Sequence, residues 1–115
     1  MIELSQIRYQ IQGDALVSSF TDKKLVDPDS IEVMGSELLA LANELKEHSL
    51  TRLVLDFDGV EFFSSSALSQ FVLLHKKMSE LGAKLVTRRL TKELLEVFQI
   101  TRLDQLFEVE ENSDE

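Results

Sequence analysis

Three consecutive serines, Ser64 to Ser66, carry the clearest chemical potential in this 115-residue chain. They lie where an apolar run ends and a helical pattern begins, and a helix start presents unpaired backbone N–H groups and the positive end of the helix dipole. The chain has 21 acidic residues, yet none lies between positions 62 and 79, so a phosphate added here would occupy an otherwise unneutralised helix end. Simple capping is the alternative, because one serine often caps a helix and stabilises it by about 1 kcal/mol.

A second chemical possibility is the pair Asp56 and Asp58 at the end of the same apolar run. Alternate residues of a strand point to one side, so the two carboxylates are placed for general acid and base work. Aspartates at strand ends more often form turns, and no nucleophile elbow, glycine-rich phosphate loop or dinucleotide fingerprint accompanies them. We therefore predict a protein that is not an enzyme and has no catalytic residue.

No cofactor or metal is expected either. His48 and His75 lack partners at metal-ligand spacing, and His75 falls within an apolar helical stripe, which is typical of a core or boundary histidine. The chain has no cysteine, which excludes disulfides and agrees with a reducing cytosol.

A strand, a helix and a second strand must position the serines. The apolar run from Leu53 to Val60 predicts a buried strand, and Asp58-Gly59 predicts a turn. From Ser66 the apolar residues recur at spacings of three and four, which predicts a helix that Gly82 ends; the predicted stripe comprises Leu68, Phe71, Val72, His75, Met78 and Leu81. Residues 84–87 return to strand character, so the two strands form a parallel pair with a right-handed crossover.

The flanking elements follow from the same patterns. Residues 7–12 and 15–20 predict a hairpin around Gly13-Asp14. A polar loop at 21–24 precedes a helix that we expect Asp29 to cap and that ends near Glu47. Thr91 is the expected cap of a shorter helix, and residues 106–109 a final edge strand.

These elements predict an α/β fold with an α+β mixed sheet. Its four to five strands comprise an N-terminal hairpin and central parallel strands, and three to four helices pack on it. We expect one domain over residues 1–109 and an acidic, disordered tail over 110–115.

The composition restricts location and partners. The formal charge is -9, which disfavours direct binding to nucleic acid or anionic membranes and favours a protein with a basic patch. We find no signal peptide and no apolar run of the roughly 18 to 20 residues that a transmembrane helix needs, so we expect a cytoplasmic protein. On the central helix Leu73 falls among polar residues, opposite the apolar stripe, and is a candidate docking residue.

The run from Leu53 to Leu68, followed by Gly82 to Leu85, resembles the core of the STAS domain, and specifically the stand-alone bacterial anti-sigma factor antagonists. In that family the loop before the helix typically reads aspartate, serine, serine, glycine, leucine, and the first serine is phosphorylated by the anti-sigma factor, which is a serine kinase. The resemblance places that serine at Ser65, with Ser64 and Ser66 as rival acceptors.

The resemblance also implies partners. The unphosphorylated antagonist would capture the kinase and release the sigma factor, phosphorylation would break the complex, and a PP2C-type phosphatase would restore it. The kinase would dock over the loop Thr21, Asp22 and Lys23, the serines, and the exposed flank of the central helix. The sequence leaves the oligomeric state open.

Two departures from the family pattern matter, because Ser64 replaces the aspartate and Ala67 replaces the glycine. The first removes a negative charge beside the phosphorylation point, and the second is expected to add bulk where a kinase approaches. The alternative function is therefore a STAS scaffold that is not phosphorylated, or a soluble subunit of a larger regulatory or transport assembly.

Overall fold

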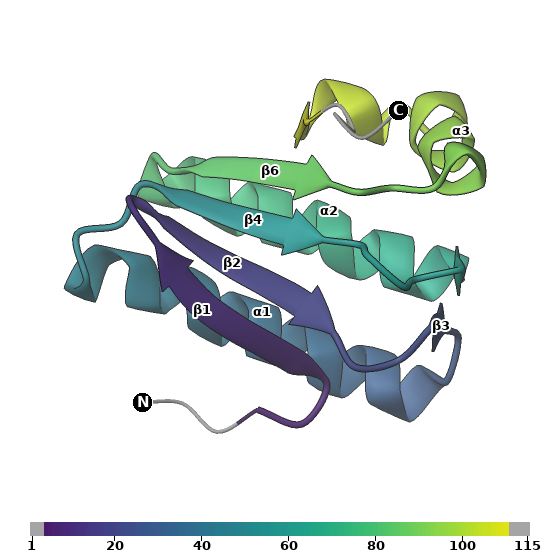
Figure 1. Cartoon of the computed structure of the whole chain (residues 1–115), viewed down its shortest axis with the longest axis horizontal. Coiled ribbons are helices and arrows are strands. Elements are labelled where there is room, and N and C mark those ends of the chain that lie inside the picture. Colours follow the sequence, from purple (N-terminus) through teal and green to yellow (C-terminus); the bar gives the residue numbers. More distant parts are fainter. Residues whose placement is uncertain (1–3, 111–115) are drawn as a thin grey trace.

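A five-stranded mixed sheet forms the centre of the protein (Figure 1). The structure is a computed structural model that describes residues 4–110. Its strands are β1 (Ile7–Gln12), β2 (Ala15–Phe20), β4 (Arg52–Asp56), β6 (Lys84–Arg88) and β7 (Glu108–Val109), in the order β1-β2-β4-β6-β7. Strands β1 and β2 are the antiparallel hairpin that the sequence predicts, and β2, β4, β6 and β7 are parallel to one another.

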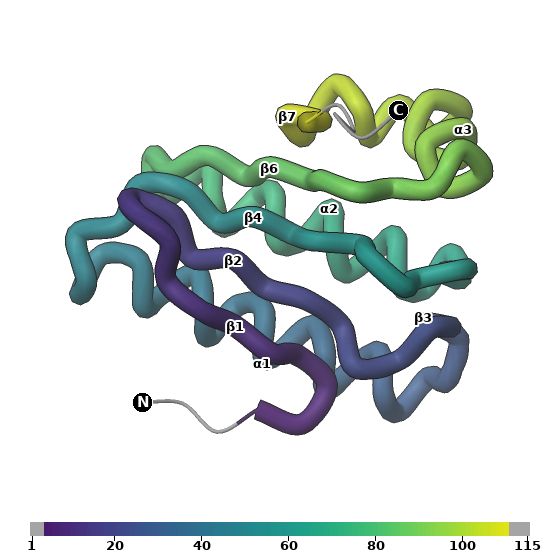
Figure 2. The backbone as a smooth tube through the Cα atoms, in the orientation of Figure 1, coloured from purple at the N-terminus to yellow at the C-terminus, as the bar shows by residue number. Residues whose placement is uncertain are grey.

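Two long helices cover one face of this sheet. Both α1 (Pro28–Glu47) and α2 (Ser65–Leu81) lie behind the strands in Figures 1 and 2, and they pack against each other. A shorter helix, α3 (Lys92–Ile100), and a 3-10 turn, η1 (Leu103–Gln105), connect β6 to β7. The mixed sheet with three α-helices confirms the predicted fold class.

A small second sheet was not expected from the sequence. Strands β3 (Lys24–Leu25) and β5 (Phe62–Phe63) pair in parallel. The polar loop predicted over residues 21–24 therefore runs into a short strand. This pairing ties the end of the hairpin to the segment that enters α2, as Figure 2 lets the reader follow.

The core lies between the sheet and the helices. It is built from the residues of β2, β4 and β6 that face the helices and from one face each of α1, α2 and α3. On α2 the fully buried residues are Ala67, Phe71, Leu74 and Met78. The predicted stripe was wrong at Val72, which is 42% exposed, and it omitted the buried Leu74.

Two other local predictions were also wrong. The first helix is capped by Asp27, whose carboxylate accepts the Ser30 N–H at 2.9 Å, and not by Asp29. Pro28 explains the difference, because proline is suited to the first helical position and places the cap just before it. The strand expected to reach Val60 ends at Asp56. The predicted turn at Asp58-Gly59 is confirmed, with Gly59 at a φ of 84° and the Val60 N–H donating to the Phe57 carbonyl.

The remaining caps are as predicted. Thr91 accepts the Leu94 N–H at 3.1 Å, and Gly82 ends α2 with a φ of 69°. Glu110, which we assigned to the acidic tail, donates its N–H to the Thr87 carbonyl at 2.8 Å. The expected disorder of the rest of that tail concerns residues 111–115, which lie outside the described residues.

Candidate functional site

Ser64 holds the start of α2. It precedes the helix in an extended conformation, and its Oγ accepts the Ala67 N–H at 3.4 Å. Its own N–H donates to the Leu25 carbonyl at 3.0 Å, which fixes the helix start to β3. Capping therefore occupies the hydroxyl of one of the three serines.

Ser65 and Ser66 occupy the first turn of α2, and both are exposed. Within residues 4–110 neither hydroxyl has a hydrogen-bond partner, and neither backbone N–H has an acceptor. The first turn contains no acidic residue. The helix start thus presents two hydroxyls and two N–H donors to solvent, which is the arrangement that favours an added anion.

The loop of Thr21, Asp22 and Lys23 lies beside the segment that enters α2. The Lys23 carbonyl accepts the Glu61 N–H at 2.7 Å, and the β3–β5 pairing begins at the next residue. All three loop residues are exposed. The structure therefore brings this predicted loop close to the serines, although more than forty residues separate them in the sequence.

Exposed apolar side chains accompany the serines. Leu73, predicted to face solvent, is 52% exposed, and the structure adds Val72 on the same helix and Phe62 in β5, which is 53% exposed. The sequence did not identify Phe62 as an exposed residue, because it is adjacent to the buried Phe63. The two side chains differ in exposure because neighbouring residues of a strand point to opposite sides.

Ala67 does not have the effect expected from the sequence. Its side chain is completely buried in the core beneath the first turn of α2. The methyl group that distinguishes it from glycine therefore adds no bulk to the exposed surface, and the expected obstruction to a kinase was wrong.

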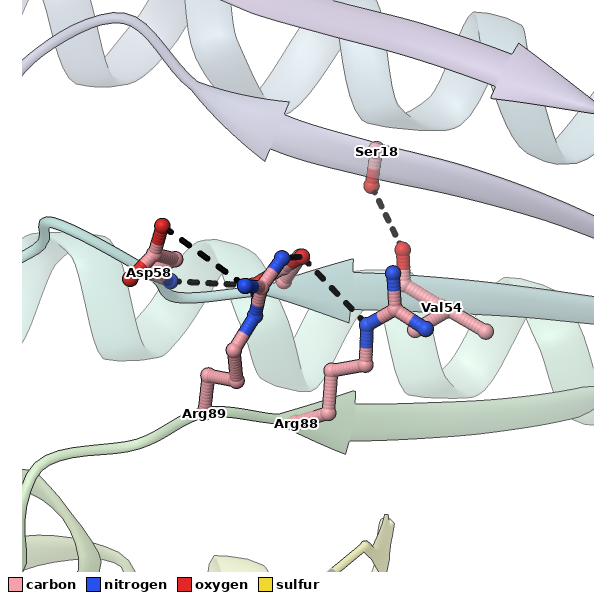
Figure 3. Close-up of polar contacts among 6 residues, drawn as sticks. Ser18, Val54, Asp58, Arg88 and Arg89 are labelled. Atoms are coloured by element: carbon pink, nitrogen blue, oxygen red, sulfur yellow. Dashed lines mark hydrogen bonds and ion pairs between the residues drawn. The ribbon is translucent and has the colours of Figure 1, made fainter. Parts of the chain in front are cut away.

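The two aspartates belong to a different cluster. Asp56 is 3% exposed, and its carboxylate accepts the Arg88 Nε at 3.3 Å, the Arg89 Nε and Nη2, and the Asp58 N–H at 3.0 Å. Figure 3 shows both arginines reaching across from the end of β6. Asp58 is exposed, with its carboxylate 3.8 Å from Arg89 Nη1. Asp56 is thus held in an ion-paired network, a structural arrangement.

The part of the chain that the structure describes contains no cluster of three metal-ligating side chains. None of its helices is both long and apolar enough to span a bilayer.

The mixed sheet, its helix layer and the exposed serine turn together define the class. The chain belongs to the STAS domain family, whose model matches residues 32–115. This fold is in general that of a non-enzymatic regulatory domain. No match was found among curated proteins.

The solved structures that share this fold include several anti-sigma factor antagonists. An anti-sigma factor antagonist (STAS) domain protein from Planctomyces limnophilus is 23% identical, with a TM-score of 0.81 over 95% of this chain and 92% of that one. A candidate antagonist from Thermotoga maritima is 18% identical, with a TM-score of 0.75 over 93% and 87%. The antagonist SpoIIAA in its unphosphorylated form is 10% identical, with a TM-score of 0.66 over 94% and 90%.

Proposed function

We propose that this protein is a cytoplasmic bacterial anti-sigma factor antagonist that is switched by phosphorylation of Ser65. In its unphosphorylated form it binds an anti-sigma factor that is a serine kinase, and the sigma factor is released. The observation that carries the proposal is the exposed Ser65 hydroxyl, which has no partner within the described residues, at the start of a helix whose cap is already supplied by Ser64. The likeness to SpoIIAA, solved in unphosphorylated and phosphorylated forms, supports it.

Phosphorylation would act through charge at the helix start. A phosphate adds about -1.5 to -2 charges at neutral pH. Around Ser65 it meets the unpaired N–H groups of the first turn and no acidic side chain in that turn. The modified residue is therefore tolerated by the fold, while a partner surface that fitted a neutral hydroxyl is repelled. A PP2C-type phosphatase would reverse the change.

The kinase surface we propose extends from the loop Thr21, Asp22 and Lys23 over the serines to Leu73. Leu73 follows Ser65 by eight residues, which is about 12 Å along a helix. A half-exposed leucine at this distance gives the partner an apolar contact beside the switch. The net charge of -9 favours a basic surface on the partner.

The proposal is tested by incubating the protein with the cognate kinase and ATP and locating the phosphate by mass spectrometry. We expect one phosphate at Ser65. Ser65→Ala should bind the kinase and no longer be released by ATP. Ser65→Asp should bind at least about tenfold more weakly than wild type, which corresponds to ~1.4 kcal/mol. Ser69→Asp places the same charge one turn along the helix and should weaken binding by a smaller factor. Absence of phosphate from all three serines would refute the switch.

The contact at Leu73 has its own matched control. Leu73→Ala should weaken kinase binding by about fivefold or more, whereas Ile100→Ala, which removes an 81% exposed side chain from the end of α3, should not. Equal effects of the two substitutions would place the interface elsewhere.

A scaffold that is not phosphorylated is the second candidate. The observation that favours it is Ser64 in the position of the family aspartate, because the resulting site lacks the carboxylate beside Ser65. Such a protein would remain bound to its partners when ATP and kinase are present. Mass determination of the native complex, with and without ATP, distinguishes the scaffold from the switch.

A further inference from the structure

The second face of the five-stranded sheet carries no helix in the described chain, and it is hollowed. In Figure 1 this face lies in front, with α1 and α2 behind it. A hollow of about 510 Å³ lies over the ends of β1, β2, β4 and β6. It is separated by the sheet from α2, so it is independent of the serine site.

Arginine is concentrated on this face. Strand register places Arg8, Ser19, Asp56 and Arg88 in one row across four strands. Arg89 follows directly, and Arg52 lies on the same face in the row of Ala15. Four of the five arginines of the chain are therefore on or beside this face, although the protein as a whole has a charge of -9.

Two of these arginines, Arg8 and Arg88, have N–H groups without a hydrogen-bond partner within residues 4–110. Arg88 donates only its Nε to Asp56, at 3.3 Å, so its two terminal nitrogens have no partner within residues 4–110. The Arg8 guanidinium has no hydrogen-bond or ion-pair partner in the same range, and neither has the Ser19 hydroxyl. All three side chains line the hollow.

The cluster is held in place by Asp56. Its buried carboxylate fixes Arg88 and Arg89 against the sheet, as Figure 3 shows for the two arginines. Arg89 adopts a φ of 58°, a conformation that residues other than glycine rarely use. A fixed guanidinium loses little conformational freedom on binding, and its planar fork matches carboxylate and phosphate oxygens.

We propose that this hollow binds a small molecule carrying a phosphate or carboxylate group, which Arg8 and Arg88 contact from opposite sides with Ser19 between them. The two arginines lie on strands three spacings apart, or about 14 Å, and both line the hollow. Asp56 acts as a positioning residue, because it holds Arg88 and does not face the ligand with an uncompensated charge.

The site is tested by titrating the full chain with sodium phosphate and, separately, with sodium succinate at constant ionic strength, followed by amide NMR shifts. We expect saturable shifts at Ser19 and Arg88 with at least one of the two anions, and the one that binds identifies the ligand as a phosphate or a carboxylate. Arg8→Gln should weaken binding at least fivefold, and it should fold normally because Arg8 has no partner among the described residues. Arg88→Gln should have a similar effect.

Arg102→Gln is the matched control. It removes the same charge from an exposed position outside the hollow, and it should leave the affinity unchanged. Equal weakening by Arg8→Gln and Arg102→Gln would show nonspecific attraction and overturn the proposal. Shifts that do not saturate with either anion would overturn it as well. If neither small anion binds but an acidic protein does, the face belongs to a macromolecular partner, and this result would also refute the inference.

Discussion

At the scale of the single residue, Asp56 shows how a carboxylate becomes part of the fold. Burial alone raises the pKa of the Asp56 carboxyl, but the hydrogen bond from Arg89, that from the Asp58 N–H, and the charges of Arg89 and Arg88 together outweigh it, so its pKa lies below the ordinary value. The charged form is therefore the one that the folded state stabilises. The carboxylate accepts hydrogen bonds from three neighbours, and these contacts make it part of the structure that holds the ends of β4 and β6 together.

We predict that Asp56→Asn lowers the free energy of unfolding by about 2 kcal/mol at pH 7, because both arginines lose a charged partner but remain partly exposed to water. A lowered folded-state pKa contributes stability that is present above the unfolded pKa, near 4, and is lost as pH falls through the folded pKa. The difference between wild type and Asp56→Asn in urea unfolding should thus shrink below about pH 4.

Asp58→Asn is the control for this pH dependence, since the Asp58 side chain is exposed and its carboxylate contacts the cluster through Arg89 Nη1, at 3.8 Å. The substitution leaves the Asp58 backbone N–H that donates to Asp56 in place. Its effect at pH 7 should be below about 1 kcal/mol. A wild-type advantage over Asp56→Asn that stays constant down to pH 3 would show that the carboxylate's charge is not what stabilises the fold.

At the scale of the element, the contact between α1 and α2 is set by a glycine. Gly35 is buried in α1, and a Cβ placed there would lie 2.0 Å from Gln70 Oε1 and 3.2 Å from Gln70 Cγ on α2. The two helices are therefore closer at this point than an alanine allows without movement of the Gln70 side chain. This close approach keeps α2, and the serine turn at its start, against α1.

We predict that Gly35→Ala lowers the free energy of unfolding by about 1 kcal/mol, because the clash outweighs the higher helix propensity of alanine. In a Gln70→Ala background the same substitution should stabilise the protein by up to about 1 kcal/mol, since the clash is gone and the propensity remains. Chemical denaturation of the four proteins measures this cycle. If Gly35→Ala stabilises the protein in both backgrounds, Gln70 moves aside without cost and the close approach is not limiting.

The sequence predicted the elements well where periodicity was long, and less well where tertiary contacts decide. The hairpin, three helices and the strands at 52–56 and 84–88 follow from alternation and helical spacing. Strands β3 and β5 have two residues each, too few for a pattern, and they exist because their chain segments meet in space. The Asp56 cluster was missed for the same reason, since Arg88 and Arg89 are more than thirty residues away.

The candidate site was predicted to a similar extent. The serine turn and the exposure of Leu73 follow from the change of period at the start of α2 and from the helical wheel. The sequence does not predict which serine caps the helix, because Ser64 is identified as the cap only by the Ala67 N–H that its hydroxyl accepts. The burial of Ala67 likewise depends on which side of the helix start meets the core.

At the scale of the whole molecule, one aromatic cluster connects the strands around the serine turn to α2 and α3. Phe57, fully buried in the turn after β4, has ring centroids within 6.0 Å of four other phenylalanines. These come from β2, β5, α2 and α3, and they are Phe20, Phe63, Phe71 and Phe98. Because the cluster contacts several elements of the fold, its loss should destabilise the edge strand and the helices to the same extent.

We therefore predict that Phe57→Ala lowers the free energy of unfolding by about 3 to 5 kcal/mol and that the protein unfolds as one cooperative unit. Two separate probes follow unfolding. Tyr9, on the edge strand β1, is the only tyrosine of a chain without tryptophan, so tyrosine fluorescence reports β1. Far-ultraviolet circular dichroism reports the helices. Both transitions should coincide in wild type and shift together in Phe57→Ala. Phe62→Ala removes the same side chain from a 53% exposed position and should cost less than about 1 kcal/mol. Two separated transitions, or a shift confined to the helical signal, would mean that the hairpin is stable without the aromatic cluster.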